Sequence, residues 1–157
     1  MAKTTRATQF LEQAGIAFTT VTYDYDPNAE RIGLQAAEAI GEAPHRVLKT
    51  LMAELDGKPV CVVVPSDREV SMKKLAAAFG GKHAAMMKPA VAEKTTGYVV
   101  GGISPFGQKK FVPTAIEIEA LSEPQVYMNG GQRGLQVRLS PQDAMKALGA
   151  IAAPLVA

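Results

Sequence analysis

The chain has 157 residues with 17 basic and 15 acidic side chains, a formal net charge of +2, one cysteine and no tryptophan. This length suits a single domain with its own core, and one cysteine excludes a disulfide framework within the chain. The balanced charge and the few aromatic residues argue against a broad nucleic-acid-binding platform, so any such contact must be local.

The N-terminal half predicts two helices and a buried hairpin. Apolar residues spaced i, i+3, i+4 and i+7 predict a helix over 5–14, and β-branched and aromatic residues predict a strand at 16–23. A polar loop and a short helix at 33–40 follow. The segments 46–55 and 59–65 are expected to pair as a hairpin, and the second is apolar on both faces, which is typical of a central strand.

The C-terminal half mixes further helices with short strands. Helices are expected at 72–79, 90–96 and 142–149. Strands are expected at 82–86, 98–100, within 111–121, and at 125–129 and 135–139; Pro113 indicates an edge or a bulge. Because hairpins are frequent, we expect one α/β domain over residues 1–157, with a mixed, curved, partly barrelled β-sheet and peripheral helices.

Conventional catalytic arrangements are missing from the sequence. His45 and His83 lie far apart, and Cys61 sits in the apolar run VCVVV, so we expect neither a metal site nor a reactive thiol. Phosphate-binding and dinucleotide-binding glycine motifs are absent, and no bound cofactor is expected. Ser104 has no indicated partner base, and Ser-Pro is more often part of a turn. Without a membrane-spanning run or a secretory signal, the chain is expected to be cytoplasmic.

Lys49 is an unusual residue in its segment. It lies in RVLKTLMAEL among mostly apolar neighbours. A lysine on either face of a core strand costs solvation free energy unless its ammonium finds a partner or a wet pocket. An edge-strand lysine that extends to water and a functional lysine both remain open.

Two glycine-rich loops, GGISPFG at 101–107 and NGGQRG at 129–134, allow two interpretations. Glycine lets a ligand approach backbone N–H groups, which suit a carbonyl oxygen, an oxyanion or a phosphate. Plain glycine turns are the commoner interpretation. Lys109, Lys110 and Arg133 form either a local basic rim or ordinary solvated surface, and Tyr23 either packs on a sugar or base or holds its own loop.

In combination these segments resemble a known family. The stretches TYDYDP (22–27), RVLKTL (46–51), TTGYVVGGISPFGQKK (95–110) and GGQRGL (130–135) occur in order before a C-terminal helix. The chain thus resembles the YbaK/EbsC family of aminoacyl-tRNA deacylases, also called the prolyl-tRNA-synthetase-associated editing domain family, over almost its whole length. The similarity is greatest to the YbaK branch, which implies removal of cysteine from mischarged Cys-tRNA(Pro), with prolyl-tRNA synthetase as a further partner.

The resemblance also implies site residues. Lys49 would hold the aminoacyl-adenosine, the amides near Gly101 and Gly102 would orient the reacting carbonyl, and Tyr23 would contact the terminal nucleotide. The other substrate-binding positions it implies are Thr50, Ile103, Ser104, Gly107, Gly130, Gly131 and Arg133. Two positions depart from the pattern: Asn129 replaces a frequent serine, and Phe111 replaces a frequent third basic residue.

The implied chemistry needs no protein nucleophile. The family resemblance implies that the substrate's own thiol attacks its carbonyl, a lyase-type cleavage rather than simple ester hydrolysis. The side chains of cysteine and proline are similar in size. A synthetase pocket that distinguishes two amino acids by about one methylene favours the correct one only about 10–200-fold. A second site that hydrolyses the wrong product is therefore required. Two alternatives stay open: water-driven editing of another charged tRNA such as Ala-tRNA(Pro), and a non-catalytic module that binds tRNA or a synthetase.

Overall fold

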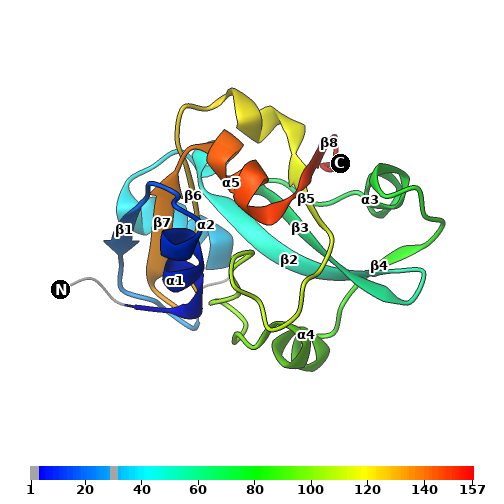
Figure 1. Ribbon diagram of the computed structural model, residues 1–157, viewed down its shortest axis with the longest axis horizontal. Coiled ribbons are helices and arrows are strands. Elements are labelled where there is room, and N and C mark those ends of the chain that lie inside the picture. The colour runs from blue at the N-terminus through cyan, green and yellow to red at the C-terminus, as the bar shows by residue number, and fades with distance from the viewer. Residues whose placement is uncertain (1–3, 29–31) are drawn as a thin grey trace.

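Two β-sheets with five α-helices around them make up the described part of the chain, residues 4–28 and 32–157 of a computed structural model (Figure 1). The five-stranded sheet has the order β4 (Ala84–Met86), β2 (Leu48–Leu55), β3 (Lys58–Pro65), β5 (Thr114–Glu117), β8 (Ile151–Ala153). The three-stranded sheet has the order β1 (Thr19–Thr22), β7 (Leu135–Leu139), β6 (Val126–Asn129). The helices are α1 (Arg6–Gln13), α2 (Ile32–Ile40), α3 (Met72–Ala78), α4 (Pro89–Thr96) and α5 (Pro141–Leu148).

The hairpin β2–β3 forms the centre of the larger sheet, as the sequence predicts. Its strands pair antiparallel, with Lys49 opposite Val64, and the residues of β3 from Val60 to Pro65 are buried. On its other side β3 pairs in parallel with β5. The edge or bulge expected from Pro113 is wrong, because β5 lies between β3 and β8. Pro113 comes just before the strand, where its carbonyl accepts a hydrogen bond from the Cys61 amide at 2.8 Å and no N–H is required of it.

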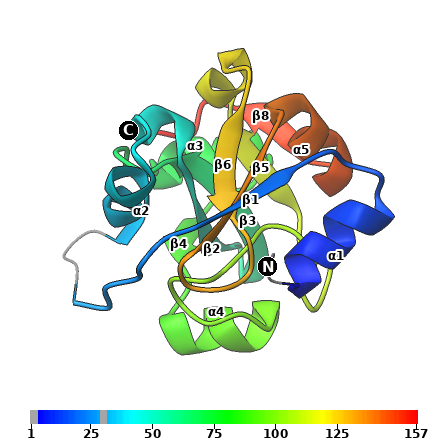
Figure 2. The same ribbon diagram turned by 90° about the vertical axis from the view of Figure 1, so that its left-hand side faces the viewer.

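The two sheets meet where β2 begins. A parallel bridge joins Val47 to Tyr127 of β6, and Figure 2 shows the three-stranded sheet crossing in front of the β2–β3 hairpin. Only this bridge joins the edge strand β6 to the chain of the larger sheet, so within the described residues the two sheets remain separate and do not close into a barrel. The mixed α/β architecture expected from the sequence is confirmed.

Helix ends follow the local signals in the sequence. Thr5 and Thr8 form a capping box at the start of α1, and Ser71 and Ser140 cap α3 and α5. Gly97 ends α4 in the left-handed conformation at φ 82°, which a residue with a Cβ adopts only at a cost. None of the helices in residues 4–28 and 32–157 is long and apolar enough to cross a membrane.

The strand expected at 98–100 is wrong. After Gly97 the chain turns back, and the amide of Gly102 donates to the carbonyl of Val99 at 2.8 Å. The phenol of Tyr98 donates to the carbonyl of Phe106 at 2.6 Å, which fixes the start of the loop to its far end. Left-handed backbone at both Gly97 and Gly101 prevents the extension that the apolar letters YVV suggest.

Candidate functional site

A cavity of about 290 Å³ lies where the two sheets meet, with β2 along one wall and α4 along another. Its walls are mostly apolar, from residues such as Val47, Leu48, Met87 and Ala92. The residues with polar side chains or loop backbone that line it are Tyr23, Lys49, Thr50, Gly101, Ile103, Asn129 and Gln136. Mostly apolar walls with a few convergent polar groups are typical of small-molecule sites.

Lys49 lines this cavity from β2 rather than extending freely into water. Its side chain is 20% exposed, and its Nζ lies 3.7 Å from Oε1 of Glu69. The Glu69 side chain is 73% exposed, so this ion pair is solvent-screened and leaves the ammonium available to a ligand. The same cavity is lined by Gly101 and Ile103 of the first glycine loop.

Two buried oxygens at the cavity have no hydrogen-bond partner among the described residues. They are Oγ1 of Thr50 and Oε1 of Gln136. The Gln136 side chain belongs to a residue only 4% exposed. Leaving a buried acceptor unpaired costs about 1–3 kcal/mol, so buried oxygens that stay unpaired are rare outside functional sites.

Tyr23 supplies a neutral phenol beside these oxygens. Burial raises the pKa of Tyr23, against the lowering effects of hydrogen bonds with the Gln136 side chain and the Gly134 backbone. The phenol therefore stays protonated at neutral pH and can donate a hydrogen bond. Gln136 and Tyr23 thus form one polar patch at the wall that the three-stranded sheet contributes.

The first glycine loop has two backbone N–H groups without a hydrogen bond within the described residues, and both belong to residues that line the cavity. They are the amides of Gly101 and Ile103. Gly102, by contrast, does not line it, and its amide donates within the turn to Val99. A Cβ on Gly102 would come within 2.9 Å of the Arg133 backbone N, so this glycine serves the close contact of the two loops.

Arg133 fixes the peptide plane that carries the Gly101 amide. Its Nε donates to the carbonyl of Val100 at 2.9 Å, and its guanidinium lies over the ring of Tyr25 at 5.2 Å from the centroid. In a trans peptide the C=O and the following N–H point in opposite directions. The hydrogen bond from Arg133 to the Val100 carbonyl therefore also fixes the direction of the Gly101 N–H, which points away from Arg133.

Five of the residues expected to bind substrate do not line the cavity: Ser104, Gly107, Gly130, Gly131 and Arg133. Ser104 is fully buried, and its Oγ accepts from the Phe106 amide at 3.1 Å. Gly107 packs against the Arg6 carbonyl of α1, and Gly130 and Gly131 donate to Leu135 and Asn129. The contacts that these four residues make hold the two glycine loops in place, and a role in substrate binding stays a prediction.

Asn129 and Gln136 are the site residues that sequence reasoning missed as ligand contacts. They face each other in the β6–β7 register. Asn129 donates from Nδ2 to the Gly101 carbonyl at 3.0 Å and accepts from the Gly131 amide at 2.7 Å, so it ties the two glycine loops together. Alternation in LQVRL places Gln136 and Arg138 on one face of the strand, but only Arg138 is exposed. The burial of Gln136 depends on the elements that cover this end of the strand, so the alternation alone does not reveal it.

The described residues offer no alternative nucleophile or metal centre at the cavity. Cys61 is fully buried in β3, and burial raises the pKa of its thiol to about 12, which confirms it as a core residue. Among residues 4–28 and 32–157, no three His, Cys, Asp or Glu side chains are grouped so as to hold a metal ion. The groups at the cavity that could act on a ligand are the ammonium of Lys49, loop backbone and the neutral polar side chains Tyr23, Thr50, Asn129 and Gln136.

The sequence of this chain is similar to a known family and to several known proteins. The family described as "Aminoacyl-tRNA editing domain" matches residues 26–147. The protein named "Putative Cys-tRNA(Pro)/Cys-tRNA(Cys) deacylase EbsC" from Enterococcus faecalis is 34% identical over 140 residues, 88% of this chain and 84% of that protein. A proline–tRNA ligase from Moorella thermoacetica is 38% identical over 64 residues, 41% of this chain and 11% of that enzyme.

Among solved structures, one titled "Crystal structure of a putative trans-editing enzyme for prolyl tRNA synthetase" shares the fold with a TM-score of 0.82 at 22% identity, covering 97% of this chain and 95% of that one. The family match spans the hairpin with Lys49, both glycine loops and Gln136. The chain belongs to the aminoacyl-tRNA editing domain family.

Proposed function

We propose that this protein is an aminoacyl-tRNA deacylase that removes cysteine from mischarged Cys-tRNA(Pro). The observation that carries the proposal is the cavity itself, where Lys49, two unpaired buried oxygens and two unpaired backbone amides converge. Membership of the editing family supports the reaction class. The name of the Enterococcus faecalis relative supports cysteine as the amino acid removed.

Lys49 and the loop amides act on different parts of the aminoacyl ester. The ester carbonyl oxygen gains negative charge when its carbon is attacked, and in this proposal the N–H groups of Gly101 and Ile103 stabilise that charge; both residues line the cavity. The Lys49 ammonium holds the terminal adenosine and adds positive charge to the same space. Positioning and electrostatics of this kind suffice when the substrate brings its own nucleophile.

The nucleophile is the thiol of the bound cysteine. Its sulfur forms a bond to the ester carbon, and the bond from that carbon to the terminal ribose oxygen breaks. The thiol proton ends on the ribose hydroxyl of the released tRNA, and the amino acid leaves as a cyclic thioester that water then opens. The unpaired oxygens of Gln136 and Thr50 accept hydrogen bonds from donors of the substrate, such as its amino group or a ribose hydroxyl.

Water-driven editing of Ala-tRNA(Pro) is the nearest alternative. A non-catalytic module that binds tRNA or prolyl-tRNA synthetase is another, and the match to part of a proline–tRNA ligase supports an association with proline charging. Either role belongs in the cytoplasm, where tRNAs are charged.

A deacylation panel separates these functions. Purified protein is incubated with tRNA(Pro) charged with cysteine, serine or alanine, and the remaining ester is measured over time. We expect cysteine to be released well above the rate without protein, and serine and alanine to be retained. Serine released as fast as cysteine would exclude thiol attack, preferred release of alanine would establish the alternative, and binding without release would establish the adaptor role.

A further inference from the structure

Exposed apolar side chains occur on the segments that border the cavity. Of the seven large apolar side chains exposed in the described residues, Met86 (47%) and Val100 (39%) line the cavity, and Val91 (41%) and Val99 (50%) are the chain neighbours of the lining residues Ala92 and Val100. The apolar surface therefore continues from the interior of the cavity onto the outside. A contiguous exposed apolar surface next to a cavity indicates that something binds there.

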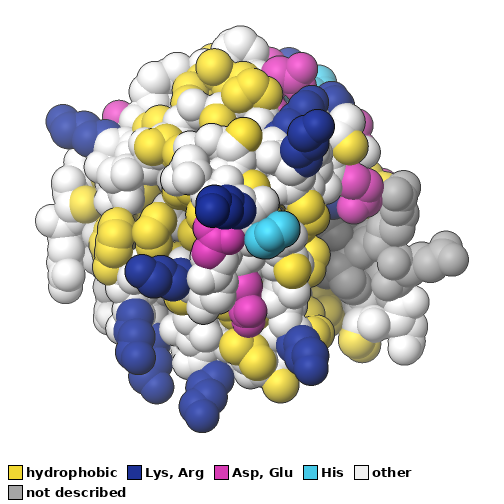
Figure 3. All heavy atoms as spheres, turned by 90° about the vertical axis from the view of Figure 1, so that its right-hand side faces the viewer, with side chains coloured by type: hydrophobic (Ala, Val, Ile, Leu, Met, Phe, Trp, Pro, Cys, Tyr) yellow, Lys and Arg dark blue, Asp and Glu magenta, His cyan; other side chains and the backbone are white. Residues whose placement is uncertain are grey.

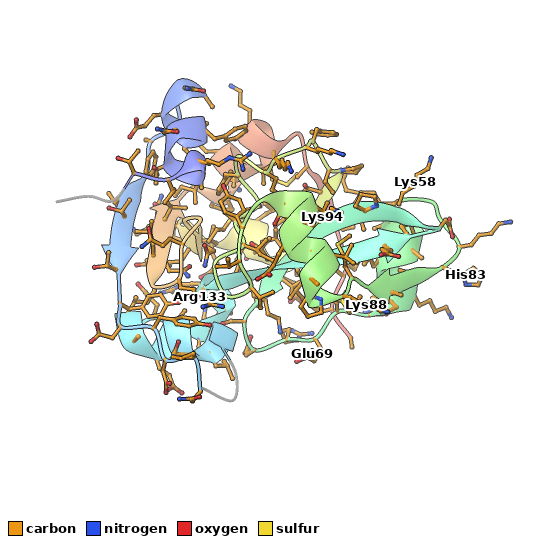
Figure 4. All side chains as sticks on the ribbon, turned by 90° about the horizontal axis from the view of Figure 1, so that it is seen from below. Lys58, Glu69, His83, Lys88, Lys94 and Arg133 are labelled. Atoms are coloured by element: carbon orange, nitrogen blue, oxygen red, sulfur yellow. The ribbon has the colours of Figure 1, made fainter. Side chains whose placement is uncertain are left out.

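Two lysines on α4 lie within this apolar surface. Lys88 is the N-cap residue of α4 and Lys94 lies in its last turn, as Figure 4 shows. Residues three apart are neighbours on a helix, so Val91 lies between the two lysines on one stripe. Both lysines are exposed, and neither has an ion-pair partner among residues 4–28 and 32–157.

Two acidic side chains lie at this surface, and each has a partner there. The carboxylate of Glu93 on α4 accepts a hydrogen bond from the Val100 amide at 2.8 Å. Glu69 lies beside Lys49 at 3.7 Å. Arg133, whose Nε donates to the Val100 carbonyl, adds a further exposed cation beside this segment.

Apolar patches alternating with cations match the chemistry of a single-stranded nucleic acid. Bases lie on apolar surface, while lysines neutralise phosphates. Six residues of helix separate Lys88 from Lys94, about 9 Å along the axis, which corresponds to about three stacked nucleotides. A folded protein partner does not require this alternation, and it would not need the surface to continue into a cavity that holds an ester.

We infer that this surface, here called the α4 rim, binds the unpaired 3′ strand of the charged tRNA. The α4 rim consists of Met86, Lys88, Val91, Lys94, Val99 and Val100. The strand lies along α4 with its phosphates toward the two lysines, and its terminal nucleoside enters the cavity between Met86 and Val100. This inference rests on the proposed function for the identity of the RNA. Binding by the α4 rim, however, is measurable without any ester cleavage.

The first test measures binding of a short fluorescent single-stranded RNA ending in CCA by anisotropy at several salt concentrations. The double variant Lys88→Glu/Lys94→Glu should bind at least 10-fold more weakly than the wild type. Because each neutralised phosphate contributes about 0.7 to the salt slope for a single strand, the slope of log K against log salt should shrink by about 1.4.

The matched control is Lys58→Glu/Lys82→Glu. Both control lysines are exposed, and Lys58 lies at the far end of the β2–β3 hairpin from α4 (Figure 4). Figure 3 shows the face at that end, where basic side chains are scattered among acidic ones. The control should bind RNA within 2-fold of the wild type. Equal losses in both variants, or no loss in the α4 rim variant, would overturn the inference.

A second measurement separates the effect of the α4 rim on RNA binding from its effect on ester cleavage. With Cys-tRNA(Pro), the α4 rim variant should show a raised KM and an unchanged kcat. With the cysteinyl ester of adenosine, which has no phosphates, both constants should match the wild type. If the wild type cleaves neither substrate, the proposed function fails while the RNA-binding test still stands. If the α4 rim variant loses binding to prolyl-tRNA synthetase but keeps RNA binding, the surface is a protein interface and the inference is wrong.

Discussion

The side-chain amide of Asn129 donates a hydrogen bond to the carbonyl oxygen of Gly101 at 3.0 Å, which ties β6 to the loop that follows α4. Arg133 holds the preceding carbonyl, that of Val100, at 2.9 Å. Two successive peptide planes are thus fixed by side chains from the second glycine loop and its strand. Asn129 lines the cavity itself, whereas Arg133 contributes to the site only through the first glycine loop.

Replacing Lys49 by alanine should lower kcat/KM for Cys-tRNA(Pro) by at least 100-fold, about 2.7 kcal/mol of lost transition-state stabilisation. The thermal midpoint should change little, because the ion pair with exposed Glu69 contributes little to stability. Kinetics and thermal unfolding of Lys49→Ala check this, with Lys58→Ala as the control. An active Lys49→Ala protein would remove this residue from the mechanism.

Thr50→Val should separate stability from activity. The Thr50 hydroxyl is buried without a hydrogen-bond partner, so its replacement by a methyl group of similar shape should leave the free energy of unfolding unchanged or raise it by about 1 kcal/mol. Turnover should fall by about 10-fold, because a substrate donor loses its acceptor. Denaturant unfolding and single-turnover deacylation measure the two effects.

The matched control for this substitution is Thr96→Val. The Thr96 hydroxyl is buried but satisfied, donating to the Ala92 carbonyl at 2.8 Å and accepting from the Tyr98 amide at 3.1 Å. This variant should lose about 1–3 kcal/mol of stability. If Thr50→Val destabilises the protein as much as Thr96→Val does, the Thr50 oxygen has a structural partner and is not reserved for substrate.

Arg133 should act as a positioning residue. Arg133→Ala releases the Val100 carbonyl and should lower kcat about 10-fold, while KM changes by less than 3-fold, because the Gly101 amide loses its fixed direction without losing substrate contacts. Arg133→Lys keeps the charge but lacks the planar Nε–H donor and the stacking on Tyr25. The kcat of Arg133→Lys should therefore be close to that of Arg133→Ala. If Arg133→Ala instead raises KM and leaves kcat unchanged, Arg133 contacts the RNA directly.

Cys61 should resist thiol reagents in the folded protein. Burial raises the pKa of its thiol to about 12, so below that pH it stays protonated, and only the thiolate reacts. Labelling at pH 8 should proceed only after unfolding in denaturant, and its rate in the native state should report opening of the sheet. Rapid native-state labelling would show that the interior of β3 is accessible.

Capping residues and apolar runs in the sequence were sufficient to predict much of the fold. Thr5, Ser71 and Ser140 are residue types typical of helix N-caps and do cap helices here, and the all-apolar segment of β3 indicates a central strand. The strand expected at 98–100 failed because two left-handed glycines, Gly97 and Gly101, override the apolar pattern between them. The short strand β8 was missed because three residues, IAA, carry no periodicity.

The residues predicted for the site that do line the cavity come mostly from β2 and the first glycine loop, with Tyr23 the one from the three-stranded-sheet side. Lys49 was conspicuous because a charge inside an apolar strand requires an explanation, and the structure brings it to the same cavity as Tyr23, Thr50 and Gly101. Gln136 was not conspicuous, because a glutamine alternating with apolar residues is typical of a solvent-facing strand position. Its burial arises from elements remote in sequence, which a local pattern does not report.

The two walls of the cavity belong to different sheets, which meet at the bridge between Val47 and Tyr127. Lys49 and Thr50 stand on the five-stranded sheet, whereas Asn129 and Gln136 stand on the three-stranded one. We therefore expect a substitution at the junction to change the spacing of these walls more than the strand pairing within either sheet. Under the proposed function, the size of the amino acid that fits would then depend on Val47 and Tyr127, separately from the groups that contact the ester.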